Sequence, residues 1–274
     1  MVYNLNSDKL TVSINSKGAE IASVKRECME YIWQAKADVW PRHAPVLFPI
    51  VGKLKNGSLS QHGFARDKEF VCLSQSKTDI SFSLKSDQET KKLFPFDFEL
   101  IIKYTLSSDT ITCSYEVNNP SSQNLLFSIG AHPGFATPDQ LSNYILKFKA
   151  DKEYNITLLA DGLLTETKTK LPLQNGELNL NTSLFDKDAL VFENSQIDSI
   201  SLISRSGNGV ELNCVGWPYF GIWSKKGSDE FVCLEPWHGI TDSINSTGDL
   251  SQKKGIIKLE GVGKFECAFN MRFF

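Results

Sequence analysis

The sequence lacks most of the features that mark nucleic-acid-binding, secreted and membrane proteins. Its 274 residues carry 29 basic and 32 acidic side chains without long runs of one sign, for a net charge of −3. This balance gives neither the basic footprint of a nucleic-acid-binding protein nor a polybasic membrane patch. No apolar run approaches ~18 residues, and no basic segment precedes an apolar stretch at the N-terminus. We therefore expect a cytoplasmic protein, and this charge balance leaves a small neutral or anionic ligand open.

Cysteine and histidine are scarce. The six cysteines contain no C-x-x-C pair, so we expect free thiols that mostly face the core rather than disulfides. The four histidines, at 43, 62, 132 and 238, have no spacing typical of a zinc pair on one strand or helix. No G-x-S-x-G elbow, P-loop or dinucleotide glycine fingerprint is present. The sequence therefore predicts no metal site and no cofactor, and disfavours hydrolases, kinases and dehydrogenases.

What the sequence does have is period-two alternation of apolar and polar residues along its whole length. Residues 10–14, 80–84 and 111–117 alternate in the manner of half-buried strands. Gly207-Asn208-Gly209 separates two such runs and predicts a hairpin, because these residues accept the backbone conformations of tight turns. The C-terminal KFECAFNMRFF places its apolar side chains on one face.

Helical signals are few. Residues 87–92 predict a turn or two of helix after a cap at Ser86, ending before Pro95. Many short strands without helical interludes indicate an all-β fold of two packed antiparallel sheets. No linker, composition shift or fixed-period repeat divides the chain, so we expect residues 1–274 to form one large β-sandwich domain.

Three segments, 44–70, 127–138 and 231–242, combine glycine, proline and aromatic residues with isolated polar groups. In the third, Glu235 follows an apolar run and precedes Pro236 and Trp237, so we expect its carboxylate at a strand end beside an aromatic wall. Such surroundings disfavour the charged form and can raise a carboxylate pKa from ~4.3 toward the range of a general base. The alternative is a glutamate that caps a turn or pairs with an arginine.

The other two segments contain imidazoles. His132 follows a strand-like run and precedes Pro133 and Gly134, where it is either a structural donor or a proton carrier. His62 stands beside a glycine that lets a ligand approach closely, and Arg66 offers a planar fork of donors. The alternative for these two residues is an exposed loop with a structural ion pair.

Five motifs together resemble the aldose 1-epimerase (galactose mutarotase-like) superfamily, most of all its LacX-type branch. They are WPRHAPVLFPIVG, QHGFAR, GAHPGF, LFDKDALVF and EPWHGITD, and they span the chain from about Trp40 to Asp242. Each is weak alone, and their joint occurrence in this order on an all-β chain is specific. The resemblance implies a β-supersandwich with an open cleft for a sugar or sugar phosphate, and it is compatible with a homodimer.

The resemblance also implies roles for residues of these motifs. His132 would be the general acid and Glu235 the general base of sugar ring opening, with no metal, nucleotide or covalent intermediate. The remaining residues would hold sugar oxygens: His62 and Arg66, their neighbours Gln61 and Arg42, and Asp188, for which Asp186 is the alternative. For this chemistry we expect a protonated His132 and an ionised Glu235, facing each other across a gap about as wide as one pyranose.

One turn departs from the family pattern, because Pro133 and Gly134 stand where better-known members carry a threonine and an aromatic residue. This departure puts galactose itself in doubt as the preferred substrate. The missing ring would either widen the cleft or remove a stacking surface. Candidates to supply that surface are Trp217, Tyr219, Trp223 and Trp237.

Three alternative functions remain open. A hexose-6-phosphate 1-epimerase could surround a phosphate with Arg42, Lys53 and Arg66. A carbohydrate-binding protein of the same fold would bind sugar without turnover, although binding alone would require no acid beside a base. A glycosidase would use two carboxylates, such as Glu235 and Asp242.

Overall fold

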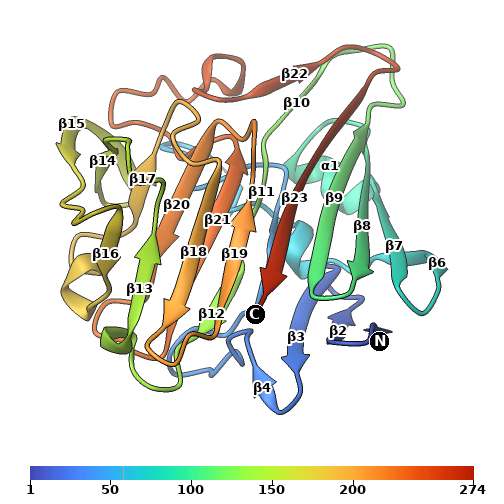
Figure 1. Cartoon of the computed structure of the whole chain (residues 1–274). Helices are drawn as coiled ribbons and strands as arrows, with labels where there is room; N and C mark the ends of the chain where they lie inside the picture. The colour runs from blue at the N-terminus through green and yellow to red at the C-terminus, as the bar shows by residue number, and fades with distance from the viewer. Residues whose placement is uncertain (58) are drawn as a thin grey trace.

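The computed structural model describes residues 1–57 and 59–274, and most of its regular structure is β-strand. The period-two segments form antiparallel strands, which join into two large sheets and two smaller ones (Figure 1). The prediction of an all-β fold built from antiparallel sheets is confirmed. Among the described residues, no helix is both long and apolar enough to cross a lipid bilayer.

The larger sheet runs across the front of Figure 1 and contains the C-terminal strand. Its nine strands lie in the order β16 (Glu177–Asn179), β13 (Tyr144–Lys147), β18 (Ser199–Ser204), β19 (Gly209–Asn213), β23 (Lys264–Phe273), β9 (Thr110–Asn118), β8 (Glu99–Ser107), β7 (Asp79–Lys85) and β6 (Val71–Gln75). Burial alternates strictly along β9, as the sequence predicts. The predicted hairpin joins β18 to β19.

The second large sheet carries the candidate site. Its strands lie in the order β15 (Leu163–Lys170), β14 (Asn155–Ala160), β17 (Leu190–Phe192), β20 (Tyr219–Trp223), β21 (Phe231–His238), β11 (Ile129–Ala131) and β5 (Val46–Leu47), and β12 (Gly134–Ala136) also pairs with β21. The most extensive apolar cluster of the described residues includes side chains from both large sheets. Phe192 of β17 packs against Phe148 beyond β13, for example, with ring centroids 6.2 Å apart.

Smaller elements complete the fold. A four-stranded sheet contains β1 (Val2–Asn6), β2 (Thr11–Asn15), β3 (Glu20–Arg26) and β4 (Met29–Glu30), and a two-stranded one contains β10 (Leu125–Phe127) and β22 (Ile257–Leu259). The helical segments are α1 (Gln88–Leu93) and the 3-10 turns η1 (Ala65–Asp67), η2 (Leu141–Asn143), η3 (Thr182–Phe185) and η4 (Leu250–Gln252).

The helix α1 forms where the sequence predicts it, but its cap is Asp87 rather than Ser86. The Asp87 carboxylate accepts from the backbone N–H of Thr90 at 2.7 Å, and the Thr90 hydroxyl accepts from the Asp87 N–H at 2.8 Å. This reciprocal pair satisfies two backbone donors that a serine at 86 would leave open. The Ser86 hydroxyl instead donates to Asp97 at 3.0 Å.

All six cysteines are free thiols, as the sequence predicts. Cys113, Cys214 and Cys233 are buried and Cys72 and Cys267 are half-buried against the core, as expected for most of the thiols, whereas Cys28 is exposed. Cys28 lies in the turn between β3 and β4, where the backbone leaves the sheet and no core is available to the side chain.

Candidate functional site

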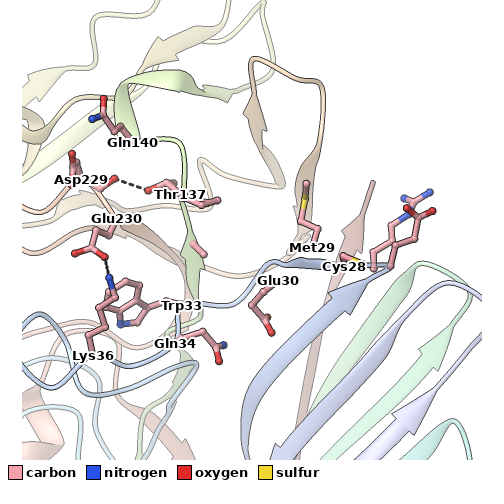
Figure 2. A pocket seen from close by; sticks show the side chains of 14 residues that line it. Cys28, Met29, Glu30, Trp33, Gln34, Lys36, Thr137, Gln140, Asp229 and Glu230 are labelled. Atoms are coloured by element: carbon pink, nitrogen blue, oxygen red, sulfur yellow. Dashed lines mark hydrogen bonds and ion pairs between the residues drawn. The ribbon is translucent and has the colours of Figure 1, made fainter.

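A cavity of about 810 Å³ lies beside β4 and is an unsuitable candidate because its buried polar groups already have partners (Figure 2). Lys36 pairs with Glu230, and the Thr137 hydroxyl donates to the carbonyl of Asp229 at 2.9 Å. The Glu30 carboxylate accepts from backbone N–H groups on either side of β4. Within residues 1–57 and 59–274, each buried polar side-chain atom that lines this cavity has a hydrogen-bond partner.

A second cavity, of about 520 Å³, collects the three motif-rich segments over the sheet that contains β21. The sequence-predicted residues that line it are His132, Glu235, His62, Arg66, Gln61, Arg42 and Asp188. Asp186 does not line it, because its carboxylate is turned to the surface, 3.8 Å from the ammonium of Lys226. The sequence left open whether Asp186 or Asp188 reaches the cavity, and in the structure it is Asp188.

His132 lies in the bend between β11 and β12, and the backbone of that bend is hydrogen-bonded on both sides. Its N–H donates to the carbonyl of Pro45 at 3.0 Å, and the carbonyl of Pro133 accepts from Leu234 of β21 at 3.2 Å. The imidazole stacks on Trp40 with ring centroids 4.9 Å apart and meets the ring of Trp223 edge-on at 5.7 Å. The ring is thus held between two indoles at the wall of the cavity.

Trp40 is a site residue that the sequence did not single out. A Cβ at Gly134 would lie 2.8 Å from the Trp40 ring, so the absence of a side chain at 134 is what admits the indole. Trp40, which lines the cavity, therefore occupies the space that a side chain at position 134 would fill. Its partner glycine lies far along the chain, so no local pattern could identify the pair.

Two of the four predicted stacking candidates, Trp223 and Trp237, line the cavity, whereas Trp217 and Tyr219 do not. Trp217 packs instead into the core, against Phe269 of β23. The Trp237 ring lies against the backbone of Gly221 on the neighbouring strand. A Cβ at position 221 would be only 2.3 Å from this ring, so the glycine leaves room for it.

Glu235 lies within β21, opposite Gly221 of β20, so the prediction of a strand end is wrong. Proline usually interrupts a strand because it has no N–H to donate to the ladder. Here Pro236 falls between the part of β21 that pairs with β12 and the part that pairs with β11, where the ladder is already discontinuous. The strand therefore continues through it, and the carboxylate is only 2% exposed.

The His132 imidazole and the Glu235 carboxylate contact each other, with 3.2 Å between Nε2 and Oε2. The expected gap of one pyranose width is therefore wrong. Burial lowers the pKa of His132 to about 3. Burial, reinforced by the negative charge of Asp188, raises the pKa of Glu235 well above its usual range. The resting pair is consequently an uncharged imidazole beside a protonated carboxyl, which corrects the expectation of a protonated His132 and an ionised Glu235.

Buried polar atoms without a hydrogen-bond partner concentrate at this cavity. Those that line it are Arg66 Nε, His132 Nδ1, Glu235 Oε2 and Trp237 Nε1. Buried polar groups in folded proteins nearly always have partners, and exceptions are often functional. Donors and acceptors are both present in this set, which suits a ligand rich in hydroxyl groups.

His62 and Arg66 form an adjacent wall, in the loop after β5 and in η1, where the His62 ring meets the His132 ring edge-on with centroids 5.3 Å apart. The backbone N–H of Gly52 donates to His62 Nδ1 at 3.1 Å, so the ring carries its proton on Nε2. Burial, followed by the charge of His132, lowers the pKa of His62 well below its usual range. Burial and the nearby charge of Arg42 lower the pKa of Arg66 to about 10. This wall therefore presents a neutral imidazole and two guanidinium groups.

Asp242 lies behind the cavity and not in it. Its carboxylate accepts from the ammonium of Lys253 at 3.0 Å and from the backbone N–H of Lys55 at 3.0 Å, and both charged side chains are buried. The pair of catalytic carboxylates that a glycosidase would need from Glu235 and Asp242 is therefore absent, and that alternative is wrong. The Asp242–Lys253 ion pair instead anchors the loop that follows β21.

We expect the substitution Lys253→Met to lower the free energy of unfolding by about 3–5 kcal/mol, because it leaves the buried charge of Asp242 uncompensated. Urea denaturation followed by tryptophan fluorescence would measure the change. The double variant Lys253→Met/Asp242→Asn should recover a large part of the loss. Equal stability of the single variant and the wild type would show that the ion pair does not anchor this loop.

Comparison with known proteins places the chain among sugar-related relatives. A family model described as Aldose 1-epimerase matches residues 1–257. Protein LacX (chromosomal) of Lactococcus lactis subsp. lactis is 30% identical over 283 residues, which cover 94% of this chain and 95% of that protein.

Two solved structures share the whole fold. A galactose mutarotase related enzyme from Lactobacillus acidophilus is 34% identical, with a TM-score of 0.95 over 100% of this chain and 97% of that one. A galactose mutarotase-like protein from Lactobacillus casei ATCC 334 is 26% identical, with a TM-score of 0.94 over the full length of both chains. The architecture that the resemblance implied is therefore confirmed.

Proposed function

The chain belongs to the aldose 1-epimerase family, and we propose that it interconverts the α and β anomers of an aldohexose or a related sugar by acid/base ring opening. The observation that carries this proposal is the contact between His132 and Glu235 at the wall of a cavity with unpartnered polar atoms. Binding alone would not require such a pair.

The contact suits the reaction better than a wide gap would. Ring opening removes the proton of the anomeric hydroxyl while the ring oxygen gains one. Both oxygens are bonded to the same carbon, so the base and the acid that serve them must lie side by side. His132 Nε2 and Glu235 Oε2, 3.2 Å apart, have this arrangement. Each group contributes about 10²–10⁴-fold in general acid–base catalysis.

The pair holds one proton, and ring opening uses that proton. Hydrogen bonds from sugar hydroxyls to the Glu235 carboxylate favour its charged form, because donors stabilise an anion. The proton then passes to His132, which leaves Glu235 as the base for the anomeric hydroxyl and His132 as the acid for the ring oxygen. After rotation about the C1–C2 bond the aldehyde is attacked on its other face, and the two groups exchange roles.

We expect kcat/KM to show no ionisation near pH 6.5, because burial lowers the pKa of His132 to about 3. An exposed histidine in the role of His132 would gain its proton as the pH falls from about pH 8 to pH 5. The plot of kcat/KM against pH would then change within that range. Anomer exchange measured across that range, with the spontaneous rate subtracted at each pH, tests this. A limb of this plot centred near pH 6.5 would contradict this prediction, because it would show that His132 or Glu235 titrates in that range.

Asp188 is proposed to accept a hydrogen bond from a sugar hydroxyl. Its side chain reaches the cavity edge, while its carboxylate also accepts from the backbone N–H of Ala189 at 2.8 Å. We expect Asp188→Asn to raise KM about tenfold or more, because the substitution removes the binding free energy of a hydrogen bond to a charged group. Asp186→Asn, which changes a neighbouring carboxylate outside the cavity, is the matched control. Equal KM values for the two variants would remove Asp188 from the binding site.

A hexose 6-phosphate is the second candidate substrate. Arg42 and Arg66 line the cavity, and the Nε of Arg66 has no partner. The third predicted cation, Lys53, does not line it, and its ammonium donates to the carbonyl of Asp161 at 3.3 Å. Two guanidinium groups suit a phosphate, although Asp67 already neutralises part of their charge at 3.0 Å from Arg42.

One experiment tests the proposal and separates these alternatives. Freshly dissolved α-glucose, α-galactose and glucose 6-phosphate are mixed with the protein, and anomer exchange is followed by polarimetry or NMR. We expect acceleration above the spontaneous rate for at least one sugar. A much larger kcat/KM for glucose 6-phosphate would identify the phosphorylated substrate. Sugar binding with an unchanged exchange rate across the panel would contradict an epimerase and favour a carbohydrate-binding protein.

A further inference from the structure

A buried thiol lies beside the acid/base pair. Cys233 and Glu235 are two residues apart on β21, so their side chains point to the same face of the sheet. The Cys233 sulfur, a ring nitrogen of His132 and a carboxylate oxygen of Glu235 all lie within 4.8 Å of one another. The proposed chemistry of sugar ring opening does not use this thiol.

From this cluster we propose that His132, Cys233 and Glu235 form a binding site for Zn²⁺ and that an occupied site blocks anomer exchange. The binding claim stands apart from the proposed function, whereas the block depends on it. The histidines lack zinc spacing along the sequence, and the expectation of no metal site was based on that spacing. Tertiary structure supplies ligands of three different types instead.

The ligand set and its dimensions fit zinc. Imidazole nitrogen, thiolate sulfur and carboxylate oxygen bind Zn²⁺ at about 2.0–2.3 Å with tetrahedral geometry, so neighbouring ligand atoms lie about 3.2–3.7 Å apart. His132 Nε2 and Glu235 Oε2 already meet this spacing at 3.2 Å. The sulfur needs to approach by about 1 Å to complete the three-ligand face. On binding, the thiol and carboxyl protons leave to solvent.

The carboxylate oxygen that would bind the metal is also unpartnered. Glu235 Oε2 has no hydrogen-bond partner, and its side chain is 2% exposed. His132 and Glu235 line the cavity, whereas Cys233 is fully buried behind them. A cation therefore has to enter through the cavity, and its fourth coordination position faces the space that a sugar would fill. Zinc and sugar should consequently compete.

Packing is the alternative role of Cys233, which also contacts the apolar cluster of Trp33 and Phe231. A test must therefore report on the sulfur itself. Co²⁺ serves as the probe, because a cobalt–thiolate bond gives a charge-transfer band in the near ultraviolet and tetrahedral Co²⁺ absorbs strongly in the visible. The reference protein carries Cys28→Ser and Cys72→Ser, which remove an exposed and a half-buried thiol that could bind cobalt elsewhere.

We expect the reduced, chelator-treated reference protein to bind about one equivalent of Co²⁺ with a thiolate band, and added Zn²⁺ to abolish the band. Adding Cys233→Ser should remove the band and weaken Zn²⁺ binding at least about tenfold. Adding Cys214→Ser, at a buried thiol distant from the site, should leave both unchanged. Glu235→Gln keeps the thiol and should weaken Co²⁺ binding while a band persists at high Co²⁺.

Anomer exchange by the reference protein should fall as Zn²⁺ is added and recover when chelator or excess sugar is added. No thiolate band in the reference protein, or a band that survives Cys233→Ser, overturns the metal site. The cobalt titration needs no turnover. It therefore tests the metal site even if the protein does not catalyse anomer exchange. Zinc that binds through Cys233 without slowing exchange would overturn the blocking role.

Discussion

Glu235→Gln is expected to reduce catalysed anomer exchange by about 10²–10⁴-fold, because an amide of the same shape cannot accept the proton of the anomeric hydroxyl. The side chain is 2% exposed, and its Oε2 lies 3.2 Å from His132 Nε2, a contact that an amide group of the same shape can keep. The fold should therefore tolerate the change. A lower rate with unchanged thermal stability separates a chemical role from a structural one.

The matched control is Glu230→Gln, directly before the same strand. Glu230 pairs with Lys36 at the other cavity and takes no part in the proposed chemistry (Figure 2). We expect this variant to exchange anomers like the wild type. Polarimetry of freshly dissolved α-sugar, at several protein concentrations, gives the catalysed rate above the spontaneous background. An active Glu235→Gln variant would refute the assignment of the base.

His132→Asn is expected to produce a loss of similar size, about 10²–10⁴-fold, because asparagine keeps a polar group but cannot donate a proton to the ring oxygen. Some loss of stability should accompany it, since the imidazole stacks on Trp40. Rates are therefore compared per folded protein. The double variant with Glu235→Gln should be little worse than either single variant, because groups that act as a unit are not additive.

A second buried histidine provides the control for packing. His238, at the end of β21, packs against Trp217 and Phe265 on the core side of the sheet. His238→Asn should lower stability without lowering the exchange rate of the folded protein. If His238→Asn and His132→Asn lost equal activity per folded protein, the effect of His132 would be one of packing rather than proton transfer.

The strand pattern and the motif positions were readable from the sequence because both are local. Alternation of period two follows directly from the geometry of a strand, and it placed residues 111–117 and the C-terminal strand on their correct faces. The seven residues predicted for the site come from the five short motifs that carry the family resemblance, and all of them line one cavity.

Local errors in the predictions have local causes. Asp87 and Ser86 are both good helix caps, and only the reciprocal bond with Thr90 chooses between them. Pro236 predicts the end of a strand, because proline normally interrupts strand pairing. The strand nevertheless continues through Pro236, where its pairing partner changes from β12 to β11. Neither choice can be made without the neighbouring backbone.

The sequence by itself determined that this is an all-β protein and which side chains could carry proton transfer, since strand periodicity and residue chemistry are properties of short segments. Only the tertiary structure decided how those side chains meet: the contact between His132 and Glu235, the uncharged state that burial imposes on them, and Trp40 over Gly134. Distance, desolvation and close packing arise between residues far apart in the chain, so no local pattern encodes them.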